Sequence, residues 1–99
     1  MFFPKRRRQV KNEEDEMDKR LGFVGIIIHS RKKSAPIVNN ILTEFGDLII
    51  GRMGIPHVKK ELSVIILIVN ATTNEVGALT GKLGKIIGVS VKSALSKVE

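Results

Sequence analysis

The aliphatic residues of this 99-residue chain are concentrated in one part of it, and this limits the fold more than any other feature. The chain holds thirteen Ile, ten Val and eight Leu, and thirty of these thirty-one residues lie after residue 20. Residues 1–20 instead carry twelve charged side chains, so they cannot bury enough apolar surface to offset the entropy lost on ordering. We therefore expect residues 1–16 to form a flexible, dispensable charged tail and residues 17–99 to form one domain.

The composition excludes several classes of protein. Because there is no Cys, the chain is not a disulfide-stapled secreted scaffold and has no thiol nucleophile. No apolar run approaches the roughly 20 residues of a membrane-spanning helix. The first residues, MFFPKRRRQ, place charge where a signal peptide would carry its apolar stretch. We therefore predict a cytoplasmic protein with no membrane partner.

Hydrophobic periodicity and turn residues predict the element order βαββαβ. We expect Ser34 to cap the first helix, with Pro36 in its first turn and Gly46 at its end. Thr72 and Glu75 form a capping box at the start of the second helix. The expected strands are 21–29, 47–55, 62–69 and 89–95, the expected helices are 34–46 and 72–88, and a polar hairpin loop is expected at 56–61.

With right-handed crossovers, this order gives a ferredoxin-like α+β sandwich, with a four-stranded antiparallel sheet of order 4-1-3-2 and two helices on one face. The first and third strands are then central, and both are apolar on their two alternating faces. Because two helices cover one face only, about six large side chains remain on the other, each forfeiting roughly 1.5–3 kcal/mol in water. We expect a homodimer or homotetramer to bury that face. The expected interface residues are Phe23, Ile27, Ile65 and Leu67, although the sequence leaves open which alternating set meets the helices.

The chain offers little material for catalysis or for a metal. Residues 21–99 hold five carboxylates, and they form no recognisable acid–base pair. It has no Gly-rich phosphate loop, and it lacks the Gly-rich first loop and Arg–Asn pair of acylphosphatases, which share the predicted fold. A transition-metal site usually needs three or four ligands, and the chain offers two histidines, His29 and His57. We therefore predict no catalytic residue, no metal and no cofactor.

The net charge of +7 suggests that the protein binds nucleic acid, but the positions of the charges weaken this prediction. In the tail, KRRR at 5–8 is followed by EEDE at 13–16, which cancels much of its attraction for phosphate. In the domain the bases are scattered, apart from Arg31-Lys32-Lys33 and Lys59-Lys60. RNA-binding domains of this fold stack bases on sheet aromatics, but the central strands offer only Phe23. A protein partner is therefore favoured over RNA, and DNA binding through the basic tail is kept as a weaker alternative.

Three segments resemble a known family. They are KRLGFVGIII (19–28), ILTEFGDLIIGRMGIP (41–56) and NATTNEVGALTGKLGKIIGVSVKSAL (70–95). The chain is similar to the small proteins described as iron-only hydrogenase system regulators, whose ACT-like fold resembles the C-terminal domain of the nickel-responsive regulator. The resemblance implies a regulatory domain that oligomerises through its sheets and senses a small effector. The chain departs from the nickel regulator in lacking its His and Cys ligands and its DNA-binding domain.

These observations give one leading hypothesis and two alternatives. The chain is expected to be an oligomeric ACT-like regulator of a hydrogenase system that senses a small effector at subunit interfaces. The expected effector residues are His29, Ser30 and Arg31, in the loop after the first strand, together with Arg52, which could clamp a carboxylate. The alternatives are an assembly partner that binds no small molecule and a weak DNA binder that uses the tail.

Overall fold

The structure of the protein is a computed structural model that describes residues 18–97, so the predicted tail at 1–16 lies outside the described residues. The described chain has the predicted order of strands and helices. The elements are β1 (Arg20–Ile28), α2 (Arg31–Glu44), the short 3-10 helix η1 (Gly46–Leu48), β2 (Ile49–Lys59), β3 (Leu62–Ala71), α3 (Thr73–Gly84) and β4 (Val89–Leu95).

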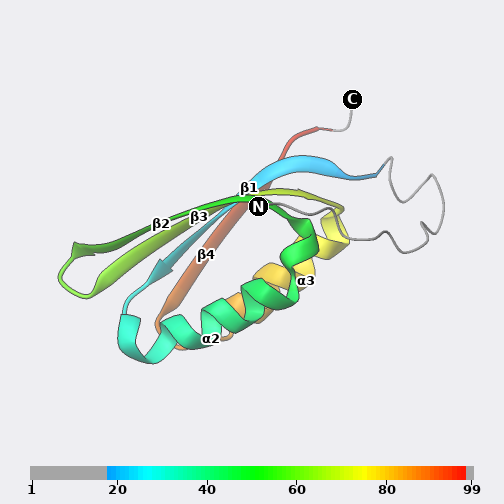
Figure 1. Ribbon diagram of the computed structural model, residues 1–99. Helices are drawn as coiled ribbons and strands as arrows, with labels where there is room; N and C mark the ends of the chain where they lie inside the picture. The colour runs from blue at the N-terminus through cyan, green and yellow to red at the C-terminus, as the bar shows by residue number, and fades with distance from the viewer. Residues whose placement is uncertain (1–17, 98–99) are drawn as a thin grey trace.

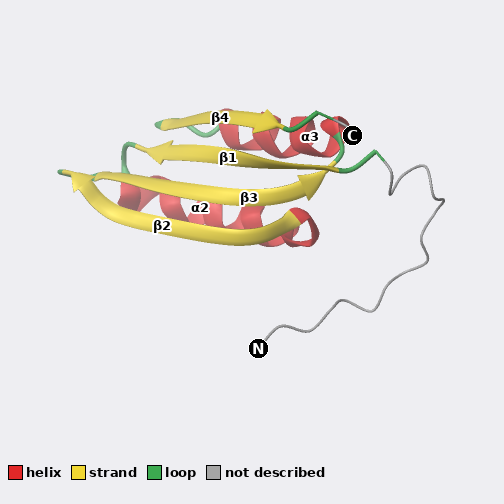
Figure 2. Cartoon of the chain, turned by 90° about the horizontal axis from the view of Figure 1, so that it is seen from above, coloured by secondary structure: helices red, strands yellow, loops and turns green. Residues whose placement is uncertain are grey.

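The four strands form one antiparallel sheet in the order β2-β3-β1-β4, which confirms the predicted topology. Both helices lie on the same side of this sheet (Figure 1). Seen from the other side, the strands lie over the helices, and no other described element lies over the strands (Figure 2). The fold is therefore the ferredoxin-like α+β sandwich that the sequence predicts.

The hydrophobic core lies between the sheet and the two helices. On β1, Val24, Ile26 and Ile28 point toward the helices and are at most 1% exposed. The helices contribute buried side chains at helical spacing. These helical core residues are Val38 and Leu42 on α2, and Val76, Leu79 and Leu83 on α3. At the start of α3, the capping box of Thr72 and Glu75 is present as predicted.

The predicted start of the first helix is wrong. Helix α2 begins at Arg31, three residues earlier than expected, and Pro36 lies inside it. The Ser34 side chain is buried, and its hydroxyl donates a hydrogen bond of 3.2 Å to the carbonyl oxygen of Ile87. A serine can cap a helix only from the residue just before its first turn, which here is Ser30. Ser34 instead links α2 to the α3–β4 loop.

The predicted bounds of the second strand are also wrong. Residues Gly46–Leu48 form a 3-10 turn, and β2 then runs from Ile49 to Lys59, through the predicted hairpin loop. Its pairing with β3 is irregular between Ile55 and Lys59. Because β2 is an edge strand, Pro56, which has no N–H to donate, can be accommodated in this irregular stretch.

Gly22 permits close contact between β1 and β4, and its replacement is expected to be destabilising. A Cβ at this position would overlap the carbonyl oxygen of Ala94 and the side chain of Leu95. We expect Gly22→Ala to lower the free energy of unfolding by about 1–3 kcal/mol in urea titrations, because the strands must separate. Gly81 is the matched control, since it lies within α3 with open space at its Cβ position. Gly81→Ala is expected to raise stability by roughly 0.5–1 kcal/mol. Equal effects would contradict this view of the β1–β4 contact.

Candidate functional site: the open face of the sheet

The side of the sheet away from the helices carries a continuous set of apolar side chains. Cross-strand pairing places them together, with Phe23 opposite Ile68 and Ile66 opposite Met53. Phe23 is 54% exposed and Met53 57%, although both are large and apolar. We call this set the open face; it consists of Leu21, Phe23, Ile27, Met53, Ile55, Val64, Ile66 and Ile68.

The structure corrects half of the predicted interface set. Phe23 and Ile27 lie on the open face, but Ile65 and Leu67 do not. Leu67 pairs with Val24 on the helix side of the sheet and is fully buried there. Because both alternating sets of β3 are aliphatic, hydrophobicity alone could not distinguish them. Val64, Ile66 and Ile68 take the place of Ile65 and Leu67 on the open face.

The edge strand β4 gives the open face a polar border. Its residues Ser90 and Lys92 pair with Ile27 and Gly25, so they lie on the same side as the apolar set. An apolar centre with a polar rim is the usual anatomy of a protein–protein interface. A lysine on an edge strand also discourages uncontrolled strand addition. The open face therefore has the composition of an interface with a defined boundary.

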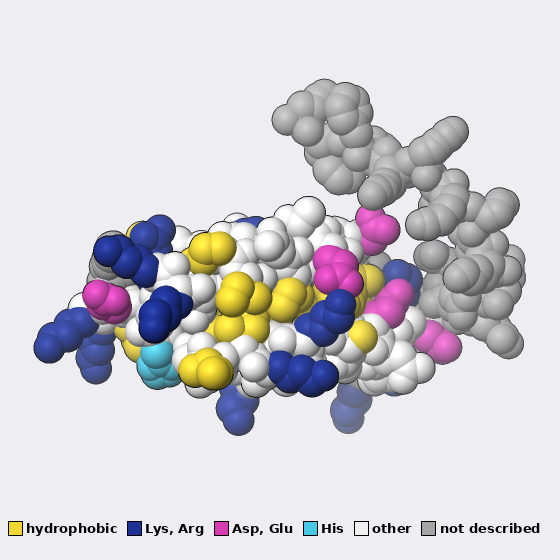
Figure 3. All heavy atoms as spheres, turned by 90° about the horizontal axis from the view of Figure 1, so that it is seen from below, with side chains coloured by type: hydrophobic (Ala, Val, Ile, Leu, Met, Phe, Trp, Pro, Cys, Tyr) yellow, Lys and Arg dark blue, Asp and Glu magenta, His cyan; other side chains and the backbone are white. Residues whose placement is uncertain are grey.

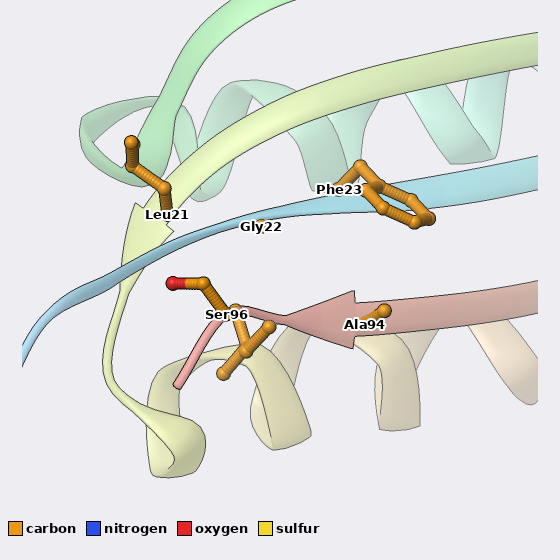
Figure 4. A pocket seen from close by; sticks show the side chains of 6 residues that line it. Leu21, Gly22, Phe23, Ala94 and Ser96 are labelled. Carbon is orange, nitrogen blue, oxygen red and sulfur yellow. The ribbon is translucent and has the colours of Figure 1, made fainter. Parts of the chain in front are cut away.

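A shallow pocket of about 350 Å³ lies at one end of the open face, between β1 and β4. Figure 4 shows Leu21, Gly22 and Phe23 on the β1 side of it and Ala94 and Ser96 on the β4 side. The backbone N–H of Ser96 donates a 2.8 Å hydrogen bond to the carbonyl oxygen of Leu21, which holds the two strands together here. This volume is at the lower end of the range for small-molecule sites, and the lining is mostly apolar. The pocket could not be predicted from the sequence, because its shape depends on how the ends of β1 and β4 pair.

The predicted effector residues do not converge on one site. His29 and Ser30 connect β1 to α2, and Arg31 begins the helix; the His29 N–H donates to the carbonyl oxygen of Gly88 at 2.8 Å. Arg52 lies on β2, and its Nη2 donates to Oδ1 of Asn39 at 2.6 Å.

Strand pairing shows how far Arg52 lies from that loop. Arg52 is opposite Leu67, whereas the end of β1 at Ile28 is opposite Ser63. The four intervening steps along β3 amount to about 13 Å. The structure therefore brings His29, Ser30 and Arg31 together and places Arg52 apart from them, where it joins β2 to α2.

Among residues 18–97, no group of three or more His, Cys, Asp or Glu side chains is placed to hold a metal ion. His57 lies in β2, and its side chain is not among those described. In the same part of the chain, no helix has the length and apolar character needed to cross a bilayer.

The fold and the open face define a small ACT-like domain, and comparison with solved structures supports this class. The ACT domain of GTP pyrophosphokinase from Chlorobium tepidum matches with a TM-score of 0.64 at 19% identity, covering 78% of this chain and 88% of that one. The C-terminal domain of MgtC from Mycobacterium tuberculosis also matches with a TM-score of 0.64, at 14% identity, covering 88% and 94%. At these identities the likeness concerns the fold alone.

A family assignment follows from two closer matches. The model of the TM1266-like family, described as "Iron-only hydrogenase system regulator, putative", matches residues 20–93. The uncharacterized protein TM1266 from Thermotoga maritima is 35% identical, with a TM-score of 0.75, covering 80% of this chain and 99% of that one. The chain belongs to this family. No curated protein matches it.

Proposed function

We propose that this protein is a regulatory module of an iron-only hydrogenase system that pairs with a second copy through its open face and senses a small effector at the resulting interface. The family description supports the regulatory role. The ACT-like fold and the lack of a recognisable acid–base pair in the sequence both favour binding over catalysis.

The single observation that carries this proposal is the exposure of the open face. Leu21, Phe23 and Ile68 are between 44% and 58% exposed and lie side by side on the central strands. Burying a side chain of this size contributes up to roughly 1.5–3 kcal/mol, so docking against a second apolar surface would be favoured by a large free energy. A second copy offers such a surface, since a two-fold axis pairs the same patch with itself.

The pocket between β1 and β4 is the better position for the effector than the residues predicted from the sequence. It adjoins the open face through Leu21 and Phe23, so a second copy on that face would lie over its mouth. The lining carries no charged side chain and one hydroxyl, that of Ser96. The chemistry fits a small uncharged or mainly apolar group, with one hydrogen bond to set its orientation.

A thermal-shift screen tests the effector role. Amino acids, nucleotides and divalent metals are added to the full chain, and a ligand that binds only the folded state raises the unfolding temperature. We expect at least one apolar amino acid or similar small molecule to raise it by several degrees. No shift with any class would contradict effector sensing and leave the assembly role.

A pair of variants then locates the site. Ala94→Leu fills the pocket, whereas Ala78→Leu adds the same atoms to an exposed position on α3. We expect Ala94→Leu to abolish the thermal shift and Ala78→Leu to retain it. A shift that survives in both variants would place the effector elsewhere.

A further inference from the structure

Two basic runs that are far apart in the sequence lie at the same end of the domain. Arg31, Lys32 and Lys33 form the first turn of α2, immediately after β1. Lys59 ends β2 at the hairpin, opposite Leu62, and Lys60 follows it. Ile28, at the end of β1, pairs with Ser63, so the hairpin and the start of α2 share one end of the sheet. Figure 3 shows Lys and Arg side chains gathered at that end, on the left. We call Arg31, Lys32, Lys33, Lys59 and Lys60 the basic end.

Most of these cations lack a carboxylate partner. The salt bridges of Lys19 with Glu75 and of Lys82 with Glu44 involve none of Arg31, Lys32, Lys33 and Lys59. Arg31, Lys32, Lys33 and Lys59 make no ion pair with any carboxylate of the described residues. The other described carboxylate near the hairpin is Glu61. The basic end thus keeps a net charge of about +4 with little internal neutralisation.

The position of three of the cations is unfavourable for the helix that holds them. The N-terminus of a helix carries a partial positive charge, so cations in its first turn are destabilising. The first turn of α2 contains no acidic residue, and the Ser30 side chain makes no capping hydrogen bond. An anion at this end would relieve the repulsion among the cations and would accept hydrogen bonds from the free backbone N–H groups.

We propose that the basic end binds the phosphate backbone of double-stranded nucleic acid without reading its sequence. Phosphates spaced along a backbone match cations on two separate segments better than one small anion does. The basic end has no Phe, Tyr or Trp ring on which unpaired bases could stack, which disfavours single strands. Four of its five cations are lysines, which bind phosphate as point charges. The proposal concerns the domain itself, independently of the open face and of the charged tail.

The test is fluorescence anisotropy of a labelled 20-base-pair duplex, titrated with the full chain at several NaCl concentrations. Each phosphate contact contributes about −0.9 to the slope of log K against log salt, so about four contacts predict a slope near −3.6. Three double variants with the same change in net charge are compared: Lys32→Glu with Lys33→Glu in the basic end, Arg6→Glu with Arg7→Glu in the tail, and Lys92→Glu with Lys97→Glu elsewhere.

We expect the basic-end variant to bind at least tenfold more weakly at 50 mM NaCl, with a shallower slope, and the other two to change less than threefold. Loss confined to the tail variant would overturn the proposal in favour of the tail. Equal losses in all three would show an effect of net charge only, which also overturns it. Equally tight, equally salt-dependent binding of polyglutamate would replace nucleic acid by an acidic protein partner.

Misfolding of the basic-end variant is not expected to account for a loss of duplex binding. Acidic residues in the first turn complement the helix dipole, so the basic-end variant should unfold at an equal or higher temperature than the unmodified chain. The mass of each variant, measured in the same samples by light scattering, reports self-association through the open face separately. A loss of duplex binding at unchanged mass therefore results from the change in the basic end and not from a change in self-association.

Discussion

Leu67→Ala is expected to lower the free energy of unfolding by about 2–5 kcal/mol, because the Leu67 side chain is fully buried between the sheet and the helices. Removing it deletes buried apolar surface and leaves a cavity that the packed strands cannot close. Urea titration followed by circular dichroism measures the change. Ile37→Ala is the control, because Ile37 lies on α2 and is 48% exposed. It is expected to cost less than about 1 kcal/mol.

This comparison tests which side of β3 belongs to the core. If Leu67→Ala were as mild as Ile37→Ala, while Ile66→Ala were severe at protein concentrations too low for self-association, the two faces would be reversed. The result would then restore the interface set expected from the sequence, with Ile65 and Leu67 facing outward.

Ile68→Lys is expected to convert the proposed oligomer to a monomer. Ile68 is 44% exposed and lies opposite Phe23, on the central strands of the open face. A lysine there would be buried without a partner in both copies of a two-fold pair, since each copy contributes the same surface. With each 1.4 kcal/mol worth a factor of ten, we expect self-association to weaken at least a hundredfold. Size exclusion with light scattering measures it.

Ile37→Lys provides the matched control for this experiment. Ile37 is exposed to a similar extent, at 48%, but it lies on the helix side of the molecule. We expect this variant to retain the mass of the unmodified protein. If Ile37→Lys gave the monomer and Ile68→Lys did not, the helices would form the interface and the open face would need another explanation.

The architecture could be predicted from the sequence because its signals are local. Segments 21–29 and 62–69 are apolar on both faces, which identifies them as central strands and, with the element order, gives the topology. The capping box of Thr72 and Glu75 is contained in four residues and is confirmed. The prediction that Ser34 caps the first helix is wrong because a capping serine and a buried serine cannot be distinguished in the sequence. Its hydrogen bond to Ile87 joins residues 53 positions apart.

The candidate site depended on pairings that no local pattern contains. Two helices can cover only one face of the sheet, so the sequence predicts that an apolar face is left uncovered. Which residues lie on that face depends on which alternating side chains of β3 share the helix side with Val24 and Ile26. The pocket requires the ends of β1 and β4 to meet at Gly22. Arg52 was grouped with His29 on the basis of chemistry alone, and strand register separates them. The two basic runs are far apart in the sequence, and strand pairing brings the hairpin and the start of α2 to the same end of the sheet.

We expect a second copy of the chain to cover the open face. Sedimentation equilibrium of the unmodified protein at micromolar concentration measures this self-association. The expected mass is two or four times that of the 11.0 kDa chain, falling toward the mass of one chain for Ile68→Lys. A mass of 11.0 kDa for the unmodified protein across that range would contradict it.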